Sequence, residues 1–217
     1  MDKELDLLLN LLDNPDLSVL EERIVEGKMG KHHVVIAKCG IGKVNAALNA
    51  YKLIERFHPD IILNSGVAGG AGIPIGSLLV ADKVAYHDVW CGPGTIYGQA
   101  DGMPEFLIPD KKVLSILSNH ASHDSIVTGL ICSGDKFISN ADEIAFIKSK
   151  FPDVKAVDME SATIAQVAMS EEIPFAIVRV VSDTPGEGEN ISQYKDFWTN
   201  APVKTFNLIK DLLTNLE

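Results

Sequence analysis

The sequence is poor in arginine and cysteine and has no long apolar run. Only Arg23, Arg56 and Arg179 carry a guanidinium group, and the formal net charge is −11. An acidic chain with so few arginines is a poor match for a nucleic acid or an anionic membrane surface. No apolar run approaches the roughly 20 residues of a membrane-spanning helix. We therefore expect neither a nucleic acid nor a membrane as a partner.

The cysteines and histidines do not form the sets that disulfide frameworks and metal sites require. Cys39, Cys91 and Cys132 are far apart and odd in number, a pattern that indicates the reducing cytoplasm. His32 and His33 would point to opposite faces of a strand, whereas a metal needs ligands that converge. At the N-terminus, acidic residues precede the apolar segment, which is not the order of a signal peptide. The sequence thus predicts a cytoplasmic protein without a metal.

Apolar strands alternate with helical segments along the chain, and 46% of the residues are hydrophobic. Both features are typical of a single α/β domain with a full-sized core, here residues 1–217. Residues 14–16 include a proline and are predicted to stop a first helix. The predicted helices are 2–12, 44–57, 111–120, 141–150 and 201–216, and the predicted strands are 18–25, 31–38, 61–64, 77–86, 125–132 and 175–181.

Two glycine-rich segments follow predicted strands. Residues 39–43 either bind an anion at the start of the next helix or form a tight turn. The turn is favoured, because the longer spacing of a phosphate-binding loop is absent. The glycines in 66–70 follow the strand 61–64 directly, and they either let the backbone approach a ligand or form an ordinary turn. The long loop 89–109 is more often functional than idle in a compact domain.

The stretch 156–183 carries the strongest functional signal. A strand end leads to Asp158, Met159 and Glu160, a helix of small apolar residues follows, and a second apolar run ends in Asp183. This strand–helix–strand order predicts two parallel strands. Ligands bind at the carboxyl ends of such strands, so Glu160 and Asp183 are expected to face one pocket. Alone, each carboxylate would more often be structural, at a helix start or as a cap.

Several single residues have both a functional and a structural interpretation. Phe137 is either a core residue or the ring on which a flat base stacks. His87, at a strand end, is equally a candidate for the site and for the core. Cys132 lies in a predicted strand and is more often core than reactive. Ser161 and Ser182 have no His/Asp partners in the sequence, so a serine nucleophile is not expected.

Six segments together carry a resemblance to a known family. They read CGIGKVNAAL, NSGVAGG, YHD, SGDKFI, VDMESATIAQVA and RVVSD, in this order. The set resembles the nucleoside phosphorylase superfamily and, within it, the 5′-methylthioadenosine/S-adenosylhomocysteine nucleosidases, over residues 1–198. The MES, SD and SGDxFI motifs are specific, whereas the glycine turns are not. The resemblance implies a three-layer α/β/α fold with a mixed central β-sheet, a homodimer, a small-molecule nucleoside substrate and no cofactor.

The resemblance also implies an activity, the hydrolysis of the adenine N-glycosidic bond of 5′-methylthioadenosine and S-adenosylhomocysteine. Adenine and a 5-thioribose product would be released. Asp183 would be the general acid at adenine N7, Glu4 would activate the attacking water, and Glu160 would bind the ribose 2′- and 3′-hydroxyls. The other residues that the resemblance implies around the substrate are Met159 against the sugar, Phe137 stacked on adenine, Ile138 at its edge, and Asp158, Ser182, Arg179 and Val67.

Two features depart from the family pattern. The family has a β-strand immediately before the segment that matches Met1, and we expect the sheet here to lack it. Val67 stands where some members carry a serine beside the catalytic aspartate, which removes one hydrogen bond to Asp183.

Three alternative functions remain open at the level of sequence. A purine nucleoside phosphorylase would hold phosphate with arginines, and none lies in the glycine turns, so hydrolysis is preferred. A futalosine-type nucleosidase would accept another base or 5′ group, next to which the loop 89–109 is expected. A non-catalytic adenosine-binding protein would bind the nucleoside without releasing the base.

Overall fold

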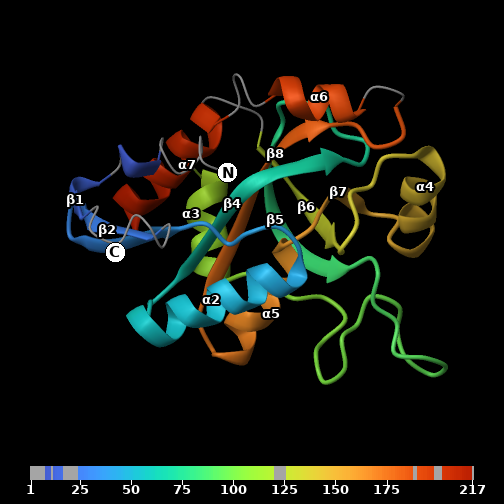
Figure 1. The fold of residues 1–217 in the computed structure, drawn as a ribbon, viewed down its shortest axis with the longest axis horizontal. Coiled ribbons are helices and arrows are strands. Elements are labelled where there is room, and N and C mark those ends of the chain that lie inside the picture. The colour runs from blue at the N-terminus through green and yellow to red at the C-terminus, as the bar shows by residue number, and fades with distance from the viewer. Residues whose placement is uncertain are drawn as a thin grey trace.

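The computed structural model of the chain describes residues 8–10, 12–16, 24–119, 126–187, 190–197 and 202–216. At its centre, five strands of the described residues form one mixed sheet (Figure 1). These strands are β4 (Ile62–Gly70), β5 (Leu78–Tyr86), β6 (Ile126–Ser133), β7 (Val154–Asp158) and β8 (Phe175–Asp183). Their spatial order is β4-β7-β6-β5-β8, and β8 pairs with β4 to close a barrel.

The strand directions divide this sheet into two sets. Strands β5, β6 and β7 run parallel to one another, and β4 runs parallel to β8. The sets meet in antiparallel pairs, β5 with β8 and β4 with β7. The prediction that β7 and β8 are parallel neighbours is therefore wrong, because β4 lies between them and runs against β7. The predicted α/β fold with a mixed central sheet is confirmed.

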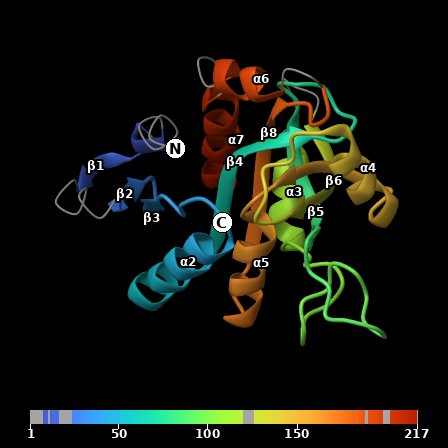
Figure 2. The same cartoon turned by 45° about the vertical axis from the view of Figure 1, so that its right-hand side comes forward.

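Helices cover both faces of the sheet (Figures 1 and 2). Alternate residues of a strand point to opposite faces. In β8, Phe175 and Ile177 pack in one cluster with the alanines of α5, whereas Ala176 and Val178 pack with α3 and α7. Helix α2 lies beside α5. The helices are α2 (Lys43–Phe57), α3 (Lys111–Asn119), α4 (Ala141–Lys150), α5 (Ser161–Ser170), α6 (Asn190–Phe197) and α7 (Pro202–Asn215).

A separate antiparallel sheet of three strands precedes α2: β1 (Asp13–Asp16), β2 (Ile24–Met29) and β3 (His32–Ala37). The predicted strand pair around the glycine turn is thus confirmed for the described residues. Residues 14–16 do more than stop a helix, since Asp13 and Asp16 pair with Lys28 and Glu26 of β2. Most of the predicted helix 2–12 and residues 18–23 of the predicted strand 18–25 lie outside the described residues.

Strand β4 extends through the glycines that were predicted to follow it as a turn or ligand contact. Its pairing with β8 continues from Ile62 to Gly69. A Cβ atom on Gly69 would lie 2.6 Å from Pro185 Cγ, and one on Gly70 would lie 2.7 Å from Val181 Cγ1. The glycines therefore permit close packing of neighbouring segments rather than a reversal of the chain.

The other elements lie close to their predicted positions. Strand β5, strand β8 and helices α2, α3, α4 and α7 match the predicted segments to within about two residues, the usual uncertainty of such bounds. The predicted loop 89–109 is irregular except for a β-bridge between Leu107 and Val84. In the part of the chain that the structure describes, every helix is too short or too polar to cross a membrane.

Candidate active site

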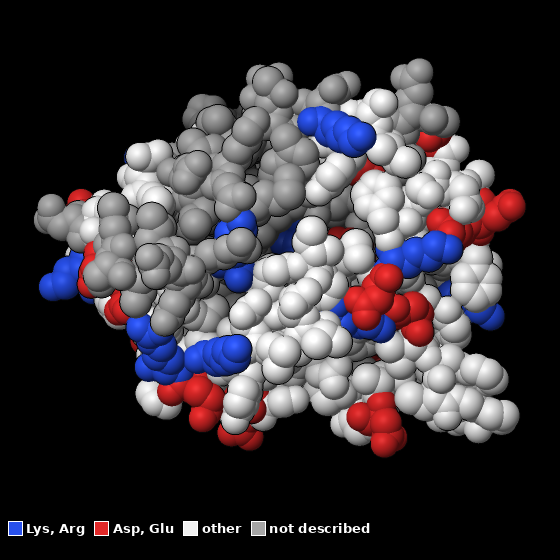
Figure 3. Space-filling view, in the orientation of Figure 1, with Lys and Arg blue, Asp and Glu red and all other residues white. Residues whose placement is uncertain are grey.

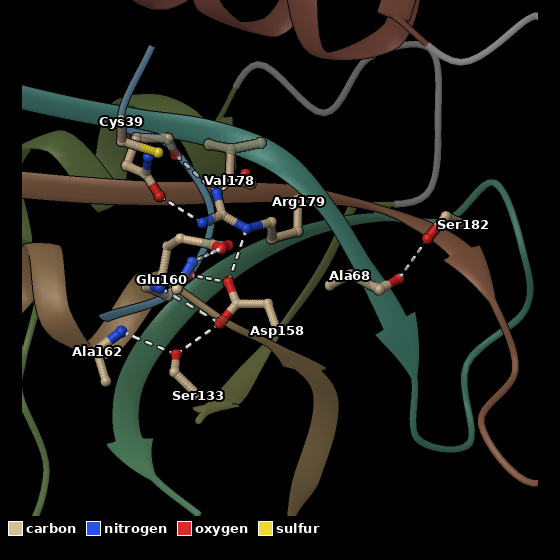
Figure 4. Close-up of polar contacts among 12 residues, drawn as sticks. Cys39, Ala68, Ser133, Asp158, Glu160, Ala162, Val178, Arg179 and Ser182 are labelled. Carbon is tan, nitrogen blue, oxygen red and sulfur yellow. Dashed lines mark hydrogen bonds and ion pairs between the residues drawn. The ribbon is translucent and has the colours of Figure 1, made fainter. Parts of the chain in front are cut away.

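A buried ion pair lies at the centre of the site (Figure 4). Arg179 of β8 and Asp158 at the end of β7 are only 2% and 8% exposed. The Arg179 Nε donates to Asp158 Oδ2 at 2.9 Å. Its other nitrogens donate to the main-chain oxygens of Val178 at 2.9 Å and Asn64 at 3.3 Å, and to the Asn64 side chain. A buried guanidinium requires such partners, because an unpaired charge in the interior is costly.

The remaining partners of Asp158 fix the start of helix α5. Ser133 Oγ donates to Asp158 Oδ1 at 2.5 Å, and Ser161 N donates to the same oxygen at 3.3 Å. The Ser161 hydroxyl donates to Asp158 Oδ2. Ser133 Oγ in turn accepts a hydrogen bond from Ala162 N at 2.9 Å. Side chains from β6 and β7 thus bind the first amides of α5, so that the strand ends and the helix start form one unit.

Glu160 precedes α5 but its side chain does not cap that helix. Its Oε1 accepts a hydrogen bond from the Gly42 amide at 2.9 Å. Burial raises the pKa of Glu160 above its ordinary value, and the charge of Asp158 raises it further, whereas the Gly42 amide and Arg179 lower it. Glu160 thus lies at the start of α5, as the helix-start interpretation has it, but its carboxylate binds the distant Gly42 amide and does not cap the helix.

The glycine turn 39–43 binds carboxylates of the chain itself. Gly42 has a φ of 85°, a conformation that favours glycine. Its amide donates to Glu160, and the next amide, that of Lys43, donates to Asp135 Oδ1 at 2.6 Å. These amides at the start of α2 are thus occupied by acidic side chains where a bound anion would otherwise lie.

A pocket lies where the ends of β7 and β8 meet the segment after β6. Gly69 of β4 is opposite Val157 on one side and Asp183 on the other, so β4 holds both strand ends together. The two ends therefore reach one pocket although their strands are not paired. The pocket is lined by Gly69, Lys136, Phe137, Ile138, Val157, Asp158, Met159, Asp183 and Pro185.

The pocket brings together five residues that the sequence singled out. Phe137 and Ile138 follow β6, Asp158 and Met159 end β7, and Asp183 ends β8. The Asp183 side chain is 2% exposed, and Ser182 Oγ donates to its Oδ1 at 2.7 Å.

The other residues singled out have different surroundings. Arg179 and Ser182 are buried outside the described lining of the pocket, and each is hydrogen-bonded to one lining residue, Asp158 or Asp183. Val67 is a partly buried residue of β4 opposite Val180 of β8. Glu4 lies outside the described residues. The roles of these residues toward a substrate stay predictions.

Phe137 is 39% exposed, which is not the environment of a core residue. The rings of Phe137 and Tyr194 of α6 pack edge to face, with a centroid distance of 5.6 Å and an interplanar angle of 70°. On the same helix, Gln193 Oε1 accepts a hydrogen bond from Thr184 N at 3.0 Å. Helix α6 therefore contacts both the segment of Phe137 and the segment that follows Asp183.

His87 is a packing residue. Its side chain is 5% exposed, and its Nε2 has no hydrogen-bond partner among the described residues. A Cβ atom on Gly134 would lie 2.3 Å from His87 Cε1, so the imidazole fills the space that a side chain at 134 would need. Burial lowers the pKa of His87 below its ordinary value, which favours the neutral ring.

The sequence did not reveal Asn64, Ser133 or the partners of Lys43. Asp88 and Asp135 lie in the YHD and SGD motifs, and Ser133 begins the latter, but no local pattern assigns a partner to them. Their contacts join residues 45 and 92 positions apart from Lys43. Such pairs become visible only in the three-dimensional structure.

Fold and site together define an α/β protein with a pocket at its strand ends, lined by a buried carboxyl group and an exposed aromatic ring. The sequence model of one protein family, the phosphorylase superfamily, matches residues 1–214. The chain therefore belongs to the phosphorylase superfamily.

Named relatives within this family are similar over the whole chain. A 5′-methylthioadenosine/S-adenosylhomocysteine nucleosidase of Geobacillus sp. is 34% identical, covering 100% of this chain and 96% of the relative. The nucleosidase of Neisseria meningitidis in complex with methylthio-immucillin-A is 31% identical with a TM-score of 0.93, covering 100% and 96% of the two chains. The nucleosidase of Colwellia psychrerythraea 34H in complex with adenine is 31% identical with a TM-score of 0.91, covering 99% and 91%.

Proposed function

We propose that this protein hydrolyses the N-glycosidic bond of 5′-methylthioadenosine and S-adenosylhomocysteine, releasing adenine and a 5-thioribose product. One observation carries the proposal: Asp183, Met159 and the open ring of Phe137 line one pocket. Two relatives with this fold, both 5′-methylthioadenosine/S-adenosylhomocysteine nucleosidases, bind methylthio-immucillin-A and adenine. Their names also favour this substrate over the futalosine-type alternative.

Four lining residues of the pocket and Glu160, which follows Met159, have roles in this proposal. Adenine stacks on Phe137, and the main chain of Ile138 binds the edge of the base. Asp183 donates a proton to adenine N7 as the bond breaks. Met159 packs against the sugar, and Glu160, whose Oε1 is held by the Gly42 amide, accepts hydrogen bonds from the ribose hydroxyls.

The chemistry requires an acid and a base on opposite sides of the scissile bond, as in glycoside hydrolysis generally. Positive charge develops on the ribose ring and negative charge on the departing base. Protonation of adenine by Asp183 makes the base a better leaving group. Glu4, on the other side of the sugar, activates the attacking water in this proposal.

Hydrolysis is favoured over phosphorolysis by the surroundings of the basic residues. The guanidinium of Arg179 is bound by Asp158, Asn64 and Val178, so it is not free to bind phosphate. Lys136, which lines the pocket, forms an ion pair with Glu143 of α4. A planar guanidinium that faced the pocket would have favoured phosphate instead.

Adenine release from methylthioadenosine, measured with and without phosphate, tests the proposal. Hydrolysis gives adenine and free methylthioribose at a rate that does not depend on phosphate. Strict phosphate dependence with a sugar 1-phosphate product would instead establish a phosphorylase. Binding of the nucleoside without release of adenine in either buffer would establish a non-catalytic binding protein.

We also infer that the protein is a homodimer. Four large apolar side chains at the start of α2 are 65%, 69%, 54% and 47% exposed: Ile41, Val44, Leu48 and Tyr51. Figure 3 shows a broad uncharged area over this part of the face. Such a patch on a soluble surface typically marks an interface. Light scattering after size-exclusion chromatography should give twice the chain mass, and Leu48→Glu should reduce it; a monomeric native protein would contradict the inference.

We further propose a single domain and a location in the cytoplasm. Residues 1–217 form one nucleoside phosphorylase-like domain, which the family match over residues 1–214 supports. The protein is cytoplasmic, which is supported by three free cysteines, Cys39, Cys91 and Cys132.

A further inference from the structure

Three charged residues outside the pocket form a compact cluster at the start of helix α2. Lys43 Nζ donates to both carboxylate oxygens of Asp88, at 2.9 and 3.0 Å, and lies 4.0 Å from Asp135 Oδ2. The Asp135 amide donates to Asp88 Oδ2 at 2.8 Å. The Asp135 side chain accepts from the Lys43 amide at 2.6 Å. The cluster therefore connects three segments: the start of α2, the end of β5 and the segment after β6.

The cluster is joined to Glu160 through consecutive amides. The Lys43 amide is bound to Asp135, and the amide before it, that of Gly42, donates to Glu160 Oε1 at 2.9 Å. Because two neighbouring peptide planes share one short turn, fixing the first constrains the direction of the second. A Cβ atom on Gly42 would lie only 3.0 Å from Asp135 Oδ1, so the turn packs directly on the cluster.

The position of Asp88 is in turn set by Gly134. A Cβ atom at 134 would lie 2.8 Å from Asp88 Cγ and 2.3 Å from His87 Cε1. The absence of a side chain at 134 thus lets Asp88 approach both Asp135 and Lys43. Three motifs that have no role in the proposed chemistry, YHD, SGD and GIGK, meet at this cluster.

We propose that Lys43, Asp88 and Asp135 are positioning residues that hold the Gly42 amide against Glu160 and so orient the carboxylate for the ribose hydroxyls. The orientation of the carboxylate toward ribose hydroxyls rests on the proposed function of Glu160. None of the three residues belongs to the described lining of the pocket, although Asp135 precedes the lining residue Lys136 in the chain. Its effect on the substrate therefore passes through the turn 40–42.

The surroundings of Glu160 explain why one amide matters. Asp158 is a negative charge that disfavours ionisation of Glu160, and Arg179 is the positive charge that opposes it. The Cys39 thiol is a further titratable neighbour, and burial raises its pKa above its ordinary value. The Gly42 and Met159 amides are the hydrogen-bond donors that lower the pKa of Glu160. Without the Gly42 amide, the carboxyl group takes up a proton more readily and becomes a poorer acceptor for hydroxyls.

The first test is Lys43→Met, with Lys83→Met as a matched control. Both lysines pair with an aspartate and lie over an aromatic ring: Lys43 is 5.5 Å from the Tyr86 ring, and Lys83 is 5.0 Å from the Phe106 ring and 3.9 Å from Asp153. The full-length protein is labelled with ¹³C at glutamate side chains, and Glu160→Gln assigns the Glu160 signal. The titration of this signal should shift to higher pH in Lys43→Met and stay at the native position in Lys83→Met.

The second measurement is affinity by calorimetry with two probes, methylthio-immucillin-A and adenine. Loss of a charge-assisted hydrogen bond corresponds to about a tenfold weaker affinity or more. We expect this loss for methylthio-immucillin-A, whose sugar-like part would be bound by Glu160 under the proposed function, and an unchanged affinity for adenine, which has no sugar. A merely structural role would weaken both probes together. Asp135→Asn, which keeps an oxygen for the Lys43 amide, should have a smaller effect than Asp135→Ala.

An unchanged Glu160 titration in both Lys43→Met and Asp88→Asn would overturn the inference, as would an equal shift in Lys83→Met. Asp88→Asn also replaces Lys43→Met if that variant does not fold. The titration needs no substrate, so it is independent of the proposed function. If Glu160→Gln leaves the affinity for methylthio-immucillin-A unchanged, the ribose role fails, and the cluster is then judged by the titration alone.

Discussion

Asp158 and Asp183 end two strands of the same sheet and line the same pocket, yet their surroundings differ. Asp158 is bound by a guanidinium and by the hydroxyls of Ser133 and Ser161, and it joins two strands to a helix. Asp183 lies beside Gly69, where a Cβ atom would be 3.4 Å from its Oδ2, and opposite the segment of Phe137. A strand end thus supplies the position of each carboxylate, whereas the neighbouring side chains give Asp158 a countercharge and a structural role.

The largest expected effect is on the Asp183 side of this comparison. Asp183→Asn should lower turnover by about 10²–10⁴-fold, the usual contribution of general acid–base catalysis, because an amide cannot donate the required proton. Its stability should change little, since asparagine has the same size and still accepts from Ser182. Steady-state adenine release and thermal unfolding measure the two quantities. Near-native turnover of Asp183→Asn would show that Asp183 is not the general acid.

Arg179→Met should have the opposite profile, with its main effect on stability. Removing one partner of a buried pair costs about 3–5 kcal/mol, because Asp158 is left without its countercharge. Urea unfolding at neutral pH gives the change in free energy of unfolding, and the double variant Arg179→Met/Asp158→Asn should regain part of the loss. A loss of about 1 kcal/mol or less, typical of an exposed pair, would argue against the scaffold role.

Phe137→Ala tests the binding of the base separately from the acid catalysis assigned to Asp183. Stacking of a base on an aromatic ring is worth about 1–3 kcal/mol, so adenine should bind roughly 5- to 150-fold more weakly. Calorimetry with adenine measures this effect. Phe146→Ala on α4 is a matched control, because Phe146 is also exposed, at 49%, but does not line the pocket. Equal effects of the two substitutions would contradict stacking on Phe137.

The smallest expected effect is a pH dependence of stability due to Glu160. Because its pKa is raised in the folded protein, the folded state binds the proton more tightly than the unfolded state. The contribution of Glu160 to stability therefore falls as the pH rises from its ordinary value of 4.5 through the folded value. Glu160→Gln does not titrate, so its stability relative to the native protein should increase across this range and then level off. Urea titrations at several pH values measure this difference, and a constant difference would contradict the prediction.

Much of the local structure could be predicted from the chain. Segments rich in apolar residues indicated β5 and β8, and helical segments indicated α2 and α4, because both signals depend on residues close in sequence. The glycines of β4 were left between a turn and a ligand contact, since a local pattern cannot distinguish a glycine that reverses the chain from one that permits close packing. The same limitation hid the Gly42 amide as the partner of the Glu160 carboxylate.

Local sequence was enough to predict the alternation of strands and helices and to place Phe137, Met159 and Asp183 at or after strand ends. The position of β4 between β7 and β8, where Gly69 holds both strand ends at one pocket, depends on the folded chain. The folded chain also decided the partners of Arg179, Glu160 and Lys43, which come from segments far away along the chain. The physical reason is that strand pairing and buried polar contacts are satisfied across the whole fold, and no local pattern records which distant group will satisfy them.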